Sequence, residues 1–252
     1  PLLNIKNLQS TDGKVNGIDM DVYPGEIVGI AGLMGSGRTE LLKCVYGLMT
    51  PKSGRVILRE KDVTGRKPWK SVAGGVFMIP EDRRKAGIVD IHSVKMNFFI
   101  SAWKRFVKNT CINDKKADEE AENLVSRLDI KTTGIHQEPR NLSGGNQQKV
   151  VFGKSIFLHP DILMLDDPTV GVDVEAKDSI CRIIGSIADS GSGVILVSSE
   201  FDHLARVCDR VLIMKQGKIC QELRRGTDVL SESALLVAVQ SYRKYCSVSF
   251  FC

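Results

Sequence analysis

The chain has 252 residues, 42% of them hydrophobic, which is enough to bury one large core or two modest ones. Charged residues make up 26% and the formal net charge is +5, without a long basic block or interleaved aromatic and basic residues, so no nucleic-acid partner is expected. No apolar run approaches the ~20 residues that span a bilayer, and any membrane role is therefore expected to be peripheral.

The chain starts at Pro1, directly in the strand-like segment LLNIKNL, and we expect it to be a piece of a longer polypeptide. Seven cysteines, an odd number, are scattered along it without a C-x-x-C pair, a usage that suits a reducing cytosol.

A glycine-rich loop follows the first unbroken apolar run, at 26–32. In the segment GLMGSGRTEL, Gly32, Gly37 and Thr39 fit the spacing G-x-x-x-x-G-K-[ST], but Arg38 stands in the lysine position. Glycines at this spacing let backbone N–H groups surround a phosphate at the start of a helix. The segment therefore predicts a phosphate-binding loop with a helix opening near Arg38, the alternative being a strand-to-helix turn without a ligand.

A second apolar run at 75–80 is followed by an interval without buried-strand character, 91–152. Ala117, Ala121, Leu124, Val125 and Leu128 mark a helical stripe in it, and the acidic residues between them are expected to form a solvated helix face. The sequence thus predicts a helical subdomain at 91–152, inserted between core segments 1–90 and 153–240.

Two further motifs follow. In LSGGNQQKV (142–150), Ser143 precedes two glycines and a helix-forming run, which predicts a second anion-binding helix start. The apolar run 161–167 ends in Asp166 and Asp167, and an acid at such a strand end holds Mg²⁺ in P-loop proteins, although two carboxylates there could also form a cap or turn.

The rest of the chain continues the alternation of strands and helices. Isoleucines at helical spacing predict a helix at about 173–189, and apolar runs at 193–199 and 211–217 predict two more strands. Unbroken rather than alternating apolar runs are typical of strands buried on both faces, so the fold class is α/β with a largely parallel sheet.

The motifs GLMGSGRT, PEDRRKAG, LSGGNQQKV, MLDDPTVGVD and LVSSE occur in an order that resembles the nucleotide-binding domain of an ABC transporter. More specifically, they resemble the second such domain in the fused ATPase of bacterial ribose/galactose-type monosaccharide importers, over residues 3 to 240. This resemblance implies an ABC-type P-loop NTPase domain at 1–240 that uses ATP and Mg²⁺, and leaves a tail, 241–252, without an assigned role.

The resemblance also implies roles for individual residues, which fall into nucleotide-binding, metal-binding and catalytic positions. The nucleotide-binding residues of the Walker A loop are Gly32, Gly35, Ser36, Gly37, Arg38, Thr39 and Glu40, and those of the signature motif are Ser143, Gly144, Gly145 and Gln147. The Mg²⁺ site consists of Thr39 and Asp166. Glu81 lies in the Q-loop, Asp167 in the catalytic-glutamate position, Asp173 in the D-loop and Ser199 in the switch-histidine position.

Several of these residues depart from a hydrolysing ABC site. Arg38 replaces a compact ammonium by a larger planar fork, and Glu40 adds a negative charge to the first helical turn. Asp167 would end about an ångström short of the attacking water, and misplacement on that scale costs on the order of 10²-fold. Ser199 lacks an imidazole, Glu81 replaces a neutral amide, and LQSTDGKVNGIDM offers no aromatic for the base, so weak nucleotide binding and slow hydrolysis are expected.

The signature motif, in contrast, is intact. In ABC dimers each ATP lies between one domain's Walker loop and the other's signature, so the resemblance implies a second ATP-binding domain as partner, expected in a preceding half. It also implies transmembrane permease subunits, which the segment 81–105 would contact through Phe98, Phe99 and Trp103; the alternative is that these aromatics only pack the subdomain. A sugar-binding protein would be reached indirectly, through the permease. The expected location is peripheral, at the cytoplasmic face of the bacterial inner membrane.

Two alternatives stay open. One is a nucleotide-binding structural or regulatory half without turnover, which the departures at Arg38, Asp167 and Ser199 favour. The other is a soluble ABC protein that acts on nucleic acid or ribosomes, which the absence of a heptad run between the two glycine motifs disfavours.

Overall fold

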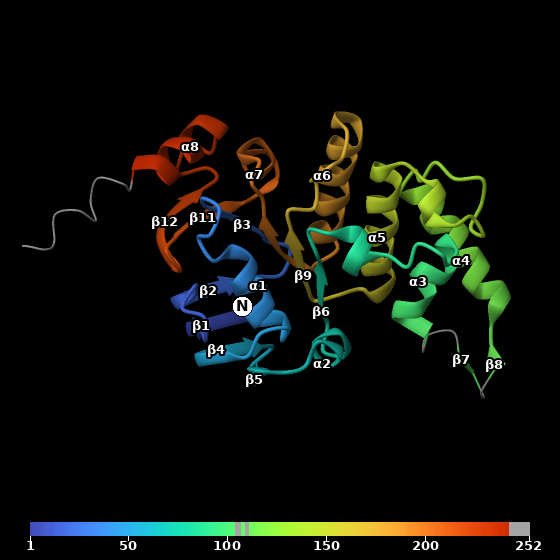
Figure 1. The fold of residues 1–252 in the computed structure, drawn as a ribbon, viewed down its shortest axis with the longest axis horizontal. Coiled ribbons are helices and arrows are strands. Elements are labelled where there is room, and N and C mark those ends of the chain that lie inside the picture. Colours follow the sequence, from blue (N-terminus) through green and yellow to red (C-terminus); the bar gives the residue numbers. More distant parts are fainter. Residues whose placement is uncertain (104–106, 109–110, 242–252) are drawn as a thin grey trace, which may run out of the picture. The chain divides into compact units, whose positions relative to one another are not determined.

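The computed structural model describes residues 1–103, 107–108 and 111–241, and the chain divides into two compact units (Figure 1). Among the described residues, unit 1 comprises 1–78, 161–167 and 188–241, and unit 2 comprises those within 79–160 and 168–187. Of the tail expected at 241–252, residues 242–252 lie outside the described residues.

Unit 1 contains a six-stranded sheet in the order β12-β11-β3-β10-β9-β6. Its strands are β3 Ile27–Ala31, β6 Val76–Ile79, β9 Ile162–Asp166, β10 Gly193–Val197, β11 Arg210–Lys215 and β12 Lys218–Arg224. Strand β10 is parallel to β3 and β9, β3 is parallel to β11, and only the pairing of β12 with β11 is antiparallel among those four pairings. All the apolar runs predicted as strands are confirmed, and β3, β9 and β10 are buried at every position.

A second sheet of unit 1, with the order β2-β1-β4-β5, was not predicted as a sheet. It consists of β1 Leu3–Ser10, β2 Asn16–Val22, β4 Pro51–Leu58 and β5 Lys61–Asp62, and the pairings of β1 with β2 and β4 and of β4 with β5 are antiparallel. Its buried side chains share one hydrophobic cluster with those of β3 and of helix α1, Arg38–Tyr46. The other helices of this unit are α2 Pro68–Ala73, α7 Phe201–Val207 and α8 Glu232–Ser241.

Unit 2 is mostly helical. It holds α3 Val94–Ala102, α4 Asp114–Arg127, α5 Gly144–Leu158 and most of α6 Val174–Asp189, with the π-helix η1 Arg83–Gly87, the 3-10 helix η3 Pro139–Asn141 and the short strands β7 Val107–Lys108 and β8 Cys111–Ile112. Helix α3 packs against α4 and α5 (Figure 1). The stripe of α4 is buried at Ala117, Ala121 and Leu124, as predicted. The predicted subdomain, 91–152, lies within this unit, and its boundaries stay a prediction.

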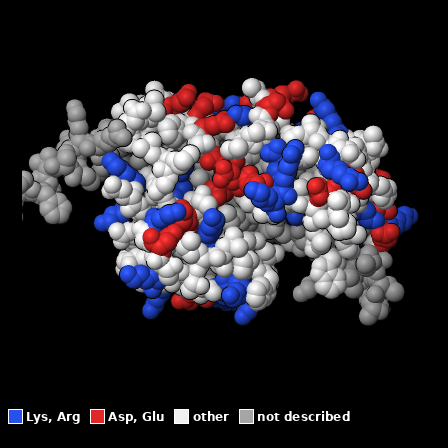
Figure 2. Space-filling model, in the orientation of Figure 1, with Lys and Arg blue, Asp and Glu red and all other residues white. Residues whose placement is uncertain are grey.

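The described surface carries both signs of charge. Lysine and arginine side chains are interspersed with aspartate and glutamate over the face in Figure 2. Across the described part of the chain, no helix has the length and apolar character to cross a membrane.

Candidate functional site

The loop between β3 and α1 is shaped by glycines that other residues could not replace. Gly37 has φ +101°, and a Cβ there would overlap the carbonyl oxygen of Lys14, while a Cβ on Gly32 would overlap that of Met214. The Oγ of Ser36 is buried and has no hydrogen-bond partner among the described residues. A tight glycine cradle with an unsatisfied buried hydroxyl fits a bound phosphate. Helix α1 begins at Arg38, as predicted.

The two residues expected at the metal site lie together. The Oγ1 of Thr39 donates to Oδ1 of Asp166 over 3.0 Å, and Asp166 is buried at the end of β9. In the described residues no cluster of three or more His, Cys, Asp or Glu side chains could hold a metal. Protein-bound Mg²⁺ typically keeps several waters and shares one or two carboxylates with substrate phosphates, so the pair of Thr39 and Asp166 is a sufficient protein contribution.

The guanidinium of Arg38 is already engaged within unit 1. Its Nη1 donates to the backbone carbonyl of Ser198 over 3.0 Å, at a buried position directly after β10. A lysine would place a single compact ammonium here, whereas the planar guanidinium of arginine extends to the end of β10. Arg38 can therefore approach a phosphate only if it releases this bond or uses its other N–H groups.

The charge of Glu40 has a partner that the sequence analysis missed. The Nζ of Lys14 lies 2.7 Å from Oε1 of Glu40, and the hydrogen bond and charge of Glu40 raise the pKa of Lys14 above its ordinary value. Lys14 belongs to the segment LQSTDGKVNGIDM, where no aromatic was found. The negative charge that Glu40 adds to the first helical turn therefore has a counter-charge in Lys14.

Asp167 and Ser199 bind each other. Asp167 has φ +46°, a conformation that is uncommon outside glycine and is found at strained functional positions. Its Oδ1 accepts the N–H of Ser199 over 2.7 Å and the Oγ of Ser199 over 3.0 Å, and its own N–H donates to the carbonyl of Val197. The carboxylate expected in the catalytic-glutamate position is thus hydrogen-bonded by the residue expected in the switch-histidine position.

In unit 2, Ser143 is the exposed N-cap of α5, as predicted. Its Oγ accepts a hydrogen bond from Nδ2 of Asn146 over 2.9 Å. A Cβ on Gly145 would come 2.6 Å from the Cβ of Ala176, so close packing requires glycine there. Gln147 is buried and its Nε2 donates to the carbonyls of Pro139 and Leu142. Its amide therefore holds the segment that leads into α5.

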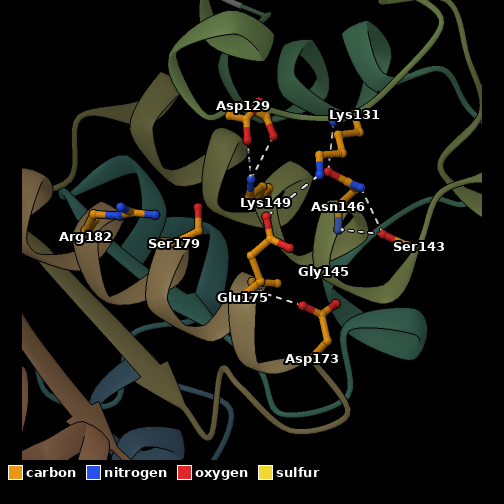
Figure 3. A pocket seen from close by; sticks show the side chains of 11 residues that line it. Asp129, Lys131, Ser143, Gly145, Asn146, Lys149, Asp173, Glu175, Ser179 and Arg182 are labelled. Atoms are coloured by element: carbon orange, nitrogen blue, oxygen red, sulfur yellow. Dashed lines mark hydrogen bonds and ion pairs between the residues drawn. The ribbon is translucent and has the colours of Figure 1, made fainter.

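A polar pocket of about 130 Å³ adjoins this helix start (Figure 3). Ser143, Gly145 and Asp173 line it on one side, and Lys149, which donates to the carbonyl of Asp129 over 2.7 Å, lines it on another. The Oδ1 of Asp173 accepts the N–H of Ala176 and so caps the first turn of α6.

The expected site residues are therefore divided between the units. Arg38, Thr39, Asp166, Asp167 and Ser199 meet in unit 1. The residues expected to form the signature motif, Ser143, Gly144, Gly145 and Gln147, lie with Asp173 in unit 2, where Glu81 is exposed between β6 and η1.

A phosphate cradle between a buried parallel strand and a helix, with a threonine and a strand-end aspartate in contact, defines a P-loop nucleotide-binding protein of the α/β class. A family model described as "ABC transporter" matches residues 15–170, more than half of the chain, and the chain belongs to this family. It is an ATP-binding domain of the ABC ATPase class.

Solved structures agree with the fold. The chain is similar to the ADP conformation of MJ1267, an ATP-binding cassette of an ABC transporter, with a TM-score of 0.78 and 19% identity over 96% of both chains. It is also similar to a nucleotide-free ATP-binding cassette from an ABC transporter, with a TM-score of 0.79 and 19% identity over 96% of this chain and 97% of that chain. The predicted ABC-type P-loop fold is confirmed.

Curated relatives are more similar in sequence. The ribose import ATP-binding protein RbsA of Pseudomonas putida is 40% identical over 227 residues, covering 90% of this chain and 44% of that protein. The arabinose import ATP-binding protein AraG of Escherichia coli O6:H1 is 39% identical over 207 residues, covering 82% of this chain and 41% of that protein. The chain thus spans less than half the length of these relatives.

Proposed function

We propose that this chain is the second nucleotide-binding domain of a monosaccharide import ATPase, and that its signature motif completes the ATP site of a preceding domain. The names of the relatives support sugar import, and the share of their length that the chain spans supports a missing half. The observation that carries the proposal is a contrast between two sites. Asp167 and Arg38 are bound by Ser199 and Ser198, whereas the signature residue Ser143 is exposed at a helix start.

At its own loop the chain offers binding groups but little catalytic machinery. The backbone N–H groups of Gly35, Gly37, Arg38 and Thr39 would hold phosphate oxygens, whereas that of Ser36 already donates to the carbonyl of Leu33. Thr39 and Asp166 would hold Mg²⁺. Bound ATP supplies the phosphoanhydride bond whose hydrolysis drives the transport cycle. The Asp167 side chain is short and its carboxylate is hydrogen-bonded to Ser199, so it is poorly placed to activate water, and Ser199 has no imidazole. Turnover at this loop is therefore expected to be about 10²- to 10³-fold below that of a complete site.

At the signature motif, the chain contributes to another domain's site. The first N–H groups of α5 have no intrahelical acceptor and carry the positive end of the helix dipole, so they favour a phosphate group presented from outside. Ser143 adds a hydroxyl at the same point. A structural or regulatory half without turnover would use the same signature geometry. The two functions differ only in whether ATP is hydrolysed at this chain's own loop.

We also propose that the exposed side of α3 receives the membrane permease. Met96, Ile100 and Trp103 are 43%, 49% and 49% exposed and recur at helical spacing, and Ile91, just before the helix, is 61% exposed. Phe98, in contrast, is fully buried and stacks on Phe157. Contiguous exposed apolar residues mark partner sites, and this surface supports a peripheral place at the cytoplasmic face of the membrane, with the sugar-binding protein contacted only through the permease.

Placing a charge in this surface should release the ATPase from the permease. For Ile100→Asp combined with Trp103→Ala, the amount of full-length protein retained on permease-containing vesicles should fall about tenfold, because a buried charge and a lost aromatic anchor oppose docking. Val237→Asp, at an exposed apolar position of α8, serves as the matched control. Retention of the double variant at the level of this control would rule out α3 as the docking surface.

The proposal as a whole is tested by comparing this chain with the full-length protein. Per mole, the chain alone should hydrolyse ATP about 10²-fold more slowly, because it contains only a weakened site and no partner loop for its signature. Circular dichroism and a cooperative thermal transition establish that the fragment is folded. Equal rates for the folded fragment and the full-length protein would overturn the asymmetric arrangement.

A further inference from the structure

The π-helix η1 lies where three functional segments of unit 2 meet. Arg83, its first residue, donates from Nη1 to the carbonyl of Val170 over 3.0 Å and from Nη2 to the carbonyl of Gly171 over 3.4 Å. These carbonyls belong to the turn between β9 and α6 that ends at Asp173. The guanidinium fork therefore holds two successive carbonyls of that turn, a geometry that suits arginine and no other side chain.

The same guanidinium reaches the signature motif. A Cβ on Gly144 would come 2.7 Å from Nη2 of Arg83, so a side chain at this position of α5 would displace the guanidinium from its present place. Gly171 has φ +68°, a left-handed conformation that favours glycine at this point of the turn. Arg83 thus lies against the residue that follows Ser143 and against the turn that precedes Asp173.

The far end of η1 is fixed to α5. The Nζ of Lys154 donates to the carbonyl of Gly87 over 2.7 Å, and a Cβ on Gly87 would lie 3.2 Å from Cγ2 of Val151. At the near end, the carboxylate of Asp82 accepts the N–H groups of Arg84 and Lys85. A π-helix is rare and is frequently found at functional sites. Here it is hydrogen-bonded to α5 at one end and capped by Asp82 at the other.

Arg83 occupies this place at a cost to stability. Its Nε is buried without a hydrogen-bond partner among the described residues, and burial lowers the pKa of the guanidinium below its ordinary value. An unsatisfied buried donor destabilises a fold. A residue that served only stability would not need a buried, unpaired Nε. A residue that orients neighbouring segments could require it.

We infer that Arg83 is a positioning residue, which sets the signature serine and the turn at Val170 and Gly171 in one fixed arrangement for the partner's ATP site. The inference rests on the proposed function, because only a signature motif that serves another domain's nucleotide needs this alignment. Arg83 itself touches no nucleotide in this scheme. It acts through Ser143 and through the D-loop turn.

The test uses the full-length ATPase assembled with its permease. Arg83→Lys retains the charge but cannot hold two carbonyls, and it should lower kcat about tenfold while the KM for ATP changes less than about threefold, since misplaced groups weaken the transition state more than the ground state. Arg84→Ala, at the exposed neighbouring arginine, is the matched control and should retain the parent kcat and KM. Arg83→Ala should show a loss at least as large, and a thermal transition recorded for each variant identifies the folded ones.

A double-mutant cycle separates positioning from a general structural effect. If Arg83 acts through the signature serine, Arg83→Lys should lower kcat by less than about twofold further in a Ser143→Ala background, because two residues acting as one unit are not additive. Full multiplication of the two losses, or a kcat of Arg83→Lys equal to that of Arg84→Ala, would overturn the inference. The proposed function fails on a different result, unchanged turnover of Ser143→Arg.

Discussion

In the full-length protein, Ser143→Arg should lower ATP turnover by about 10²- to 10³-fold, the size of effect seen when one transition-state donor is removed. Ser143 is exposed at the N-cap of α5, so an arginine there fills the space in front of the free N–H groups. A phosphate presented by the preceding domain could then no longer reach the helix start. Turnover is measured with the sugar-loaded binding protein present.

Two controls distinguish this effect from a folding defect and from loss of the chain's own site. Ser143→Asp preserves the N-cap, since aspartate caps helices as well as serine, yet its charge repels phosphate, so turnover should fall while thermal stability is retained. Thr39→Ala removes the hydroxyl that donates to Asp166 in the chain's own loop, and turnover should change less than about threefold. If Thr39→Ala were the more damaging variant, the roles of the two sites would be reversed.

The parallel sheet was predictable from the sequence because its strands are buried on both faces. Runs such as 162–166 and 193–197 contain only apolar or small residues up to the strand end, and that composition is visible without a structure. The antiparallel sheet was not predicted, because β1 has register shifts on both its edges and Asn7 has φ +45°, which breaks the alternation of buried and exposed positions.

The motifs of the candidate site were predictable, but the partners of their side chains were not. Gly37, Thr39 and Asp166 were identified from their positions in the motifs. The backbone geometry of the loop and the end of a buried strand fix those positions. The pairs that define the state of the site join residues far apart in the chain, 26 residues for Lys14 and Glu40 and 32 for Asp167 and Ser199. No local pattern encodes such contacts.

Restoring the missing groups at the chain's own loop should create a hydrolysing site. With the preceding domain's Walker lysine substituted so that its site is silent, the combination of Arg38→Lys, Asp167→Glu and Ser199→His should raise residual turnover by about 10²-fold. Lysine would release the bond to the carbonyl of Ser198, glutamate would extend the carboxylate by one methylene, and histidine would supply a ring. Steady-state phosphate release measures the gain.

The single variants show why the three changes must act together. Asp167→Glu alone leaves Ser199 in place, whose N–H and Oγ bind the carboxylate now, so the longer side chain should still be held and the gain should stay below about threefold. Ser199→His alone removes the hydroxyl donor but keeps the backbone N–H that binds the carboxylate, and it leaves that carboxylate short. If Asp167→Glu alone restored most of the activity, the bond to Ser199 would have no restraining effect, and the weakness of this site would come from side-chain length alone.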